Sequence, residues 1–320
     1  MIFPERQQLK KDATRALSMA PEANRLILIF SGSAAGASLL VALLSFLLDS
    51  GIAGTSGLSG MGMRSFLSSI QAMLSLVLTL LLPFWGMGYV KAVMKLGRRE
   101  NAQTADLFAG FRRFGPVLRT LLLQYAIFFL AGILCSNVGS TVLSMTPLGR
   151  PLAELATQMD PNLLLSPDEA TMKILLEAMV PLLIGCGVLF AAASVVLSYH
   201  FRMAQYLIMD DPQIGAIQAV VGSFRMMRGN CLKLFRMDLS FWWYYLLEFV
   251  TTAVCLGDLW LPYLGVTFPF SDDTAYFLFY IVGLALQLAV HWKFRNHLEV
   301  SYALVYDRLK DRHTTLPNAQ

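Results

Sequence analysis

Charged side chains are scarce in this chain. Asp, Glu, Lys and Arg make up 14% of its 320 residues, whereas apolar residues make up 56% and the mean hydropathy is +0.57. An ordinary globular protein carries about 25% charged residues. The shortage argues against a water-soluble fold, an intrinsically disordered chain and a basic nucleic-acid-binding module. We therefore expect a membrane protein that binds no nucleic acid.

Cysteine and histidine are also few. The four cysteines have no close spacing and lie mostly in apolar stretches, which argues against a disulfide framework or a zinc site. No pair among the four histidines has metal-ligand spacing. The chain also lacks a nucleophile-elbow, phosphate-loop, HExxH or dinucleotide-binding motif. The sequence thus predicts no metal site, no cofactor and no enzyme activity.

Long runs of apolar residues are the dominant feature of the sequence. A helix needs about 20 apolar residues to cross about 30 Å of hydrocarbon. Six stretches qualify, at about residues 26–48, 66–89, 117–143, 174–197, 237–261 and 276–294. We expect an all-α, polytopic membrane helix bundle with six transmembrane helices arranged as three hairpins. The transmembrane domain would occupy residues 26–296, between a cytoplasmic N-terminal segment (1–25) and a cytoplasmic C-terminal helix and tail (297–320).

The basic residues alternate between the polar segments. Of the 25 Lys and Arg, 22 lie before the first span, after the second, after the fourth or after the sixth, and only Arg64, Arg150 and Lys173 lie in the other loops. Cytoplasmic loops carry the excess of Lys and Arg in membrane proteins. The distribution predicts that both termini are cytoplasmic, which agrees with an even number of spans.

Two of the basic segments resemble each other. Residues 107–119 read LFAGFRRFGPVLR and residues 220–233 read VVGSFRMMRGNCLK, and each precedes an odd-numbered span. Asp211-Pro212 predicts the start of the second helix, with Asp as N-cap and Pro at the first helical position. An internal duplication and the ordinary gathering of Arg and aromatic residues at a cytoplasmic interface both explain the likeness.

Helices with an apolar face and an Arg-bearing face suit the interface of an anionic lipid leaflet. We therefore expect these amphipathic cytoplasmic helices to lie between the hairpins and to contact anionic lipids of the cytoplasmic leaflet. The residues predicted at that interface are Phe111, Arg112, Arg113, Phe224, Arg225 and Arg228.

Glu248 lies deep inside the fifth apolar stretch. A carboxyl group at that depth should be protonated or paired, because an isolated charge in hydrocarbon is costly. Its candidate partners are Gln287 and His291, which share a helix face, or Gln124 and Asn137 of the third span. Two interpretations are open: a proton or cation site within the bundle, or a buried acid that links helices by a hydrogen bond.

One stretch of the chain carries recognisable motifs. Arg228-Gly229 lies on a basic helix, Leu239-Ser240-Phe241 with Trp243 leads into a span, and Pro262-Tyr263 follows it. Together with Gly110-Phe111, this pattern resembles the bacterial integral-membrane family catalogued as domain of unknown function 975. The resemblance implies a bacterial plasma-membrane protein of several spans and brings no activity with it.

Three classes of function follow from these observations. The favoured one is a non-enzymatic membrane scaffold or regulatory protein that acts through its basic cytoplasmic helices. The alternative is a small-solute or ion transporter or channel subunit that uses Glu248 as an intramembrane site, although its hairpins repeat in parallel and not in the inverted arrangement common in transporters. A membrane enzyme acting on lipid is the third, and the sequence offers no site for it.

Overall fold

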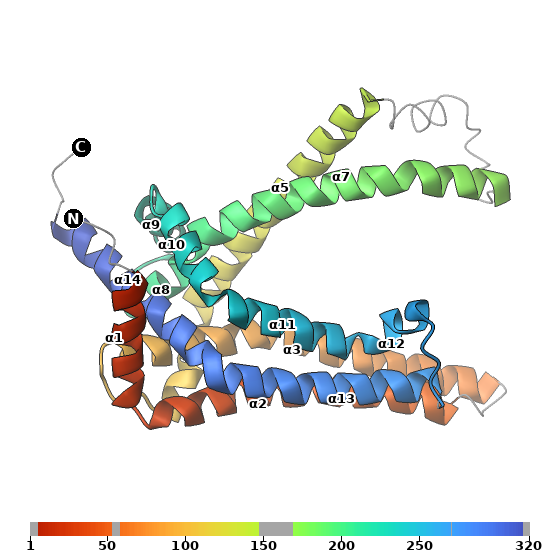
Figure 1. Ribbon diagram of the computed structural model, residues 1–320, viewed down its shortest axis with the longest axis horizontal. Helices are drawn as coiled ribbons and strands as arrows, with labels where there is room; N and C mark the ends of the chain where they lie inside the picture. Colours follow the sequence, from red (N-terminus) through yellow and green to blue (C-terminus); the bar gives the residue numbers. More distant parts are fainter. Residues whose placement is uncertain (1–5, 53–57, 147–168, 270, 316–320) are drawn as a thin grey trace.

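The computed structural model describes residues 6–52, 58–146, 169–269 and 271–315 (Figure 1). Within these ranges every regular element is a helix, so the predicted all-α class is confirmed. Five helices are long and apolar enough to cross a membrane. A sixth candidate is a bent pair, in which Cys231–Cys255 and Gly257–Leu264 meet at 67°. These helices are compatible with the predicted membrane protein.

The helices fall into a long set and a short set. The long helices are α2 (Glu22–Ile52), α3 (Leu58–Gly97), α5 (Phe114–Ser144), α7 (Glu169–Phe201), α11 (Trp242–Cys255), α13 (Asp272–Val290) and α14 (Asn296–Thr315). The short helices are α1 (Arg6–Ser18), η1 (Thr104–Phe108), α4 (Ala109–Arg112), α8 (Ala204–Asp210), α9 (Ala216–Met227), α10 (Cys231–Asp238), η2 (Leu239–Phe241), α12 (Gly257–Trp260), η3 (Pro262–Leu264) and the π-helical turn η4 (His291–Arg295).

The long apolar helices form two arms that diverge from a common base (Figure 1). In the four-helix arm, α2 packs against α3 and α13, and α13 packs against α11. In the hairpin arm, α5 and α7 pack along each other. The base is formed by α1, η1, α4, α8, α9, α10 and α14 together with the adjoining ends of the arm helices. The first and last described helices, α1 and α14, thus lie at the same end of the molecule (Figure 1).

The base and the arms bury different amounts of apolar surface. The largest fully buried side chains gather in the base and include those of Tyr206, Tyr302 and Tyr306. In the arms, many apolar side chains face outward: Phe129 on α5 is 70% exposed and Phe249 on α11 is 71% exposed. Exposed apolar surface on this scale is typical of helices that contact lipid.

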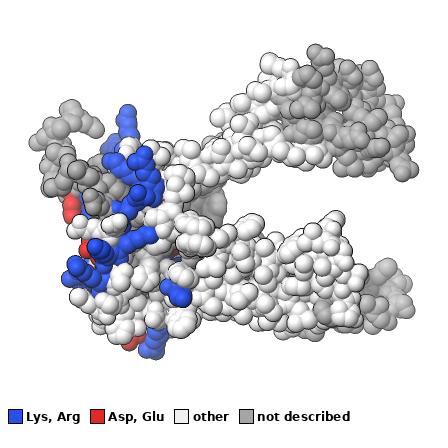
Figure 2. All heavy atoms as spheres, viewed as in Figure 1, with Lys and Arg blue, Asp and Glu red and all other residues white. Residues whose placement is uncertain are grey.

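Charge follows the same division. Figure 2 shows Lys and Arg gathered over the base, while the described parts of the two arms are almost uncharged on the face in view. The polar segments that are rich in Lys and Arg in the sequence therefore come together at one end of the folded chain, the base.

Two local predictions differ from the structure. The fifth apolar stretch is not one continuous helix, because α11 ends at Cys255 and a short separate helix starts at Gly257. The chain bends at Leu256, and the next helix packs closely on α13 there, since a Cβ at Gly257 would lie 2.6 Å from the Phe279 ring. The predicted helix start at Asp211-Pro212 is wrong: α9 begins at Ala216, and Asp211 instead accepts a hydrogen bond from the Gln213 backbone N–H at 2.9 Å. That side chain closes a turn, a common role for Asp.

Candidate functional site

A polar cluster lies within the four-helix arm, around Glu248 on α11. Its Oε1 atom lies 2.5 Å from Nε2 of His291, and its Oε2 atom accepts a hydrogen bond of 3.2 Å from Nε2 of Gln287. The structure thus brings together the three residues singled out in the sequence. The alternative partners lie elsewhere: Asn137 donates to the Ile133 carbonyl of its own helix, and Gln124 lines a separate cavity.

The cluster continues across the arm to a third helix. Nδ1 of His291 lies 3.1 Å from Oγ of Ser31 on α2, and Ser31 is buried. Tyr244, one turn before Glu248 on α11, is buried as well. The cluster therefore links α2, α11 and the junction of α13 with η4. A hydrogen-bonded chain of this kind can hold helices together or hold a proton between His291 and Glu248.

His291 is the first residue of the π-helical turn η4. Such a turn inserts an extra residue into a helix and is frequent at functional sites. Cavities of about 480, 410, 260 and 230 Å³ occur in the described part of the chain, and Glu248 lines none of these four. The carboxylate is therefore held by protein groups and does not face one of those spaces.

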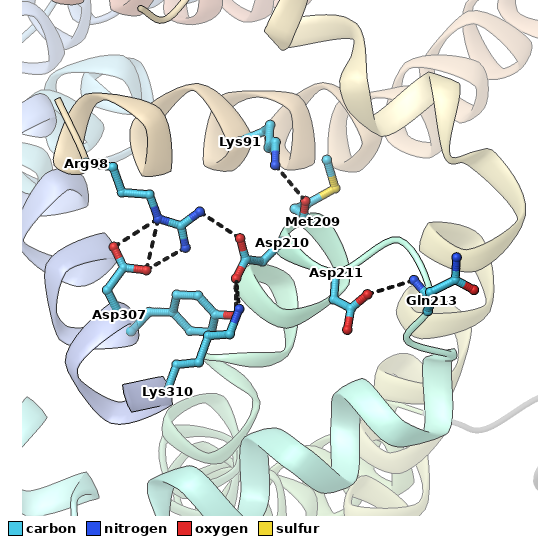
Figure 3. Close-up of polar contacts among 9 residues, drawn as sticks. Lys91, Arg98, Met209, Asp210, Asp211, Gln213, Asp307 and Lys310 are labelled. Carbon is cyan, nitrogen blue, oxygen red and sulfur yellow. Dashed lines mark hydrogen bonds and ion pairs between the residues drawn. The ribbon is translucent and has the colours of Figure 1, made fainter. Parts of the chain in front are cut away.

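A second polar cluster lies in the base and is drawn in Figure 3. Arg98, next to the end of α3, contacts Asp307 of α14 through Nη2 at 2.5 Å and Nε at 3.1 Å, and Asp210 of α8 through Nη1 at 2.7 Å. The other Asp210 oxygen accepts hydrogen bonds from the Tyr306 hydroxyl at 2.9 Å and from Lys310 Nζ at 2.6 Å. The hydrogen bonds to Asp307 and Asp210 raise the pKa of Arg98 above its ordinary value. We call these five residues the base network.

Neighbouring contacts reinforce the base network. Asp12 of α1 pairs with Arg308 of α14 at 2.7 Å, and Lys95 of α3 pairs with Asp106 of η1 at 2.7 Å. Nζ of Lys10 donates to the Ser240 carbonyl at 2.6 Å, and burial, with a smaller effect of nearby Arg6, lowers the pKa of Lys10. Segments from both halves of the chain are thus tied into one base.

A third polar cluster joins the base to the hairpin arm. Asp238 of α10 accepts hydrogen bonds from the hydroxyls of Tyr199 on α7, at 2.6 Å, and Tyr302 on α14, at 2.5 Å. The guanidinium group of Arg202 lies 4.0 Å from the centre of the Tyr302 ring. A cation over an aromatic ring at this distance is attracted to its face.

The residues predicted at the membrane interface occupy two kinds of position. The side chains of Arg112, Arg225 and Arg228 are exposed. The aromatic rings are half-buried and pack on the arms, Phe111 against Phe84 and Phe224 against Phe201. Arg113 binds the backbone carbonyls of Ile208 and, at 2.9 Å, Pro212. Three of the four arginines in this set are therefore available to a partner or to lipid.

The base network is the feature that sequence reasoning missed. Nothing in the spacing of Asp210 and Asp307 along the sequence relates them to Arg98. The available signal was the repeated tyrosine in the segments that follow the even-numbered spans, since Tyr89, Tyr206, Tyr302 and Tyr306 are all buried. Among the described residues, no group of three or more His, Cys, Asp and Glu is arranged to hold a metal ion.

Comparison with known proteins gives one match. The sequence matches the family described as "Protein of unknown function (DUF975)" over residues 5–286, from the N-terminal segment to α13. No curated protein and no solved structure matches the chain. The matched region ends within α13, just before Gln287 and His291, and does not include α14, which supplies three of the five residues of the base network. Since the match covers most of its length, the chain belongs to the DUF975 family.

Proposed function

We propose that this protein is a non-enzymatic membrane scaffold or regulatory protein of six spans, with both termini in the cytoplasm of a bacterium. The observation that carries the proposal is the base. It is tied together by ion pairs between segments distant in sequence, and it presents the exposed side chains of Arg112, Arg225 and Arg228. A rigid platform with exposed basic groups suits a partner protein of acidic surface and the anionic lipids of the cytoplasmic leaflet.

The topology is tested by cysteine labelling from outside the cell. Single cysteines are placed in a cysteine-free background at Ser18 and Asn101 of the base and at Tyr263, which is 91% exposed near the far end of the four-helix arm. A membrane-impermeant maleimide should label only the Tyr263→Cys protein in intact cells. Labelling at Ser18→Cys or Asn101→Cys without lysis would overturn the proposed orientation.

The scaffold role is tested by site-specific photocrosslinking in cells. A photoreactive residue at position 112 or 225 should give an adduct with one and the same protein, and a photoreactive residue at position 263 should not. Replacing Arg225 and Arg228 by Glu should abolish the adduct formed at position 112 while the protein stays in the membrane. Adducts with lipid alone at both base positions would contradict the scaffold role.

Proton-coupled transport of an ion or small solute is the second candidate, and the contact between Glu248 and His291 is the observation that favours it. An ionisable pair inside apolar helices is a common element of proton relays. Under this hypothesis, purified protein in liposomes with a pH gradient collapses that gradient, and Glu248→Gln stops the flux while the protein still folds. An unchanged gradient with the unmodified protein excludes this candidate.

A further inference from the structure

A polar cavity of about 260 Å³ lies where the two arms meet the base. Side chains of α2, α3 and α5 form its walls, and α8, η4 and α14 contribute residues from the base. Its charged and amide-bearing lining residues are Gln124, Arg202, Gln205, Arg295 and Glu299. We call this space the fork cavity.

The fork cavity contains hydrogen-bond donors without acceptors. Gln124 is only 8% exposed, and its Nε2 atom has no hydrogen-bond partner among the described residues. The Nε atom of Arg295 also has no hydrogen-bond partner among the described residues. It lies 3.9 Å from a carboxylate oxygen of Glu299, which is too far for a hydrogen bond. A buried donor that stays unpaired costs about 1–3 kcal/mol. Two such donors lining one space indicate that an acceptor from outside the chain belongs there.

The charges in the cavity indicate the sign of that acceptor. Arg202 and Arg295 face one carboxylate, Glu299, so the lining carries a net charge of +1. Asp238 lies outside this lining, but it lines the adjoining larger cavity together with Arg202, where its two oxygens accept from two tyrosine hydroxyls and its charge acts on Arg202 from the far side. A group with one negative charge and several acceptor oxygens, as in a phosphodiester, would balance the charge and satisfy the donors.

The surroundings of the cavity indicate where such a group comes from. Arg202 also lines a larger cavity of about 480 Å³, whose lining is mostly apolar, with Val195 of α7, Leu239 of η2 and Trp242 of α11, and includes Asp238 beside Arg202. This second space lies between the hairpin arm and the four-helix arm, which diverge from here (Figures 1 and 2). In a membrane, lipid chains fill the region between the arms.

We propose that one phospholipid molecule binds at the fork, with its phosphate group at Gln124, Arg202 and Arg295 and its acyl chains between the arms. A phosphate at this position joins α5 of the hairpin arm to η4 at the end of the four-helix arm, so the lipid forms part of the junction. Free phosphate offers the same acceptor oxygens but no apolar part for the larger cavity. This inference does not depend on the scaffold or transport roles.

Native mass spectrometry of the detergent-solubilised protein with added phosphatidylglycerol tests the proposal. The unmodified protein should retain one lipid per chain. Gln124→Leu and Arg202→Gln should each weaken retention about tenfold, as expected for the loss of a hydrogen bond to a charged group. Asn137→Leu is the matched control on α5, because Asn137 is exposed and donates to its own helix. It should leave retention unchanged.

Gln124→Leu also separates binding from folding, since the lost amide donor has no partner among the described residues. Without lipid, its melting temperature should be at least as high as that of the unmodified protein, because an unpaired buried donor is removed, and phosphatidylglycerol should raise it less. Equal retention by all variants, or no retained lipid at all, would overturn the proposal. Equal retention of diacylglycerol would exclude phosphate recognition, and displacement of the lipid by millimolar inorganic phosphate would assign the site to free phosphate.

Discussion

Two carboxylates illustrate how differently the base and the four-helix arm are held together. Asp210 in the base contacts an arginine, a lysine and a tyrosine hydroxyl that come from α14 and the end of α3. Glu248 in the four-helix arm contacts one histidine and the amide of Gln287. Asp210 is therefore paired with an arginine and a lysine, whose charge is permanent, whereas Glu248 is paired with a histidine and an amide.

The difference shows in which part of the molecule the specific polar contacts are concentrated. Helices in lipid gain little from burying apolar groups against each other, because the surrounding hydrocarbon is just as apolar. The arms accordingly need few directional contacts, and their mutual position is set at the base. We expect substitutions in the base to unfold the protein and substitutions around Glu248 to be tolerated.

The largest effect is expected for Arg98→Gln. This change removes the guanidinium group that pairs with Asp307 and that is one of the three partners of Asp210. The side chain of Arg98 is 28% exposed and that of Asp210 only 7%. Removing one member of a largely buried pair costs about 3 kcal/mol. Reversible unfolding of the solubilised protein with sodium dodecyl sulfate measures the loss. Arg99→Gln is the neighbouring control, because Arg99 is exposed and should change stability little.

The second largest effect is expected for Gly88→Ala, at the contact between α3 and η1. A Cβ at position 88 would overlap the backbone carbonyl of Leu107, and one at position 110 would overlap that of Phe84. Backbone cannot move aside as a flexible side chain can, so we expect a loss of about 2 kcal/mol. Gly32→Ala in α2 is the control, since nothing lies within 4 Å of its added Cβ. Equal unfolding curves for both variants would contradict the close packing of the base.

A smaller effect is expected for Glu248→Gln. The new amide can still accept from Gln287, so the change should cost about 1 kcal/mol, the usual strength of a hydrogen bond between membrane helices. The matched change in the base, Asp210→Asn, should cost at least twice as much, because it removes the charge that Arg98 and Lys310 share. Both are measured by the same unfolding titration. If Glu248→Gln proves the more damaging of the two, the comparison between base and arm is wrong.

The positions of the arm helices followed from the sequence. An uninterrupted apolar run of about 20 residues has few alternatives to a membrane helix, so hydropathy alone located most of them. That Glu248 needs a partner also followed, and Gln287 with His291 was one of two candidate pairs, but the choice over Gln124 and Asn137 required the structure. The break after Cys255 did not follow, since one glycine in an apolar run is usually tolerated in a helix.

The base could not be read from the sequence in the same way. Its contacts join residues more than a hundred positions apart, such as Arg98 with Asp210 and Asp307. Charge and spacing along the chain do not encode such pairs, because they depend on how α3, α8 and α14 meet. The divergence of the two arms, which creates the fork cavity, is likewise a property of the tertiary packing.

The smallest effect, and one of opposite sign, is expected for Arg99→Gly. Arg99 has a φ of +60°, and the hydrogen bonds from Glu100 N–H to the Lys95 carbonyl and from Arg99 N–H to the Leu96 carbonyl form a Schellman motif at the end of α3. Glycine adopts this left-handed conformation without the strain that a Cβ causes, so stability should rise by up to about 1 kcal/mol. Arg99→Gln keeps the strain and lacks the charge, so the two variants separate backbone from electrostatic effects in the same unfolding titration. If Arg99→Gln stabilises the protein as much as Arg99→Gly does, the backbone strain at Arg99 is not what limits stability here. Charge repulsion at the basic end of α3 would then be the cause.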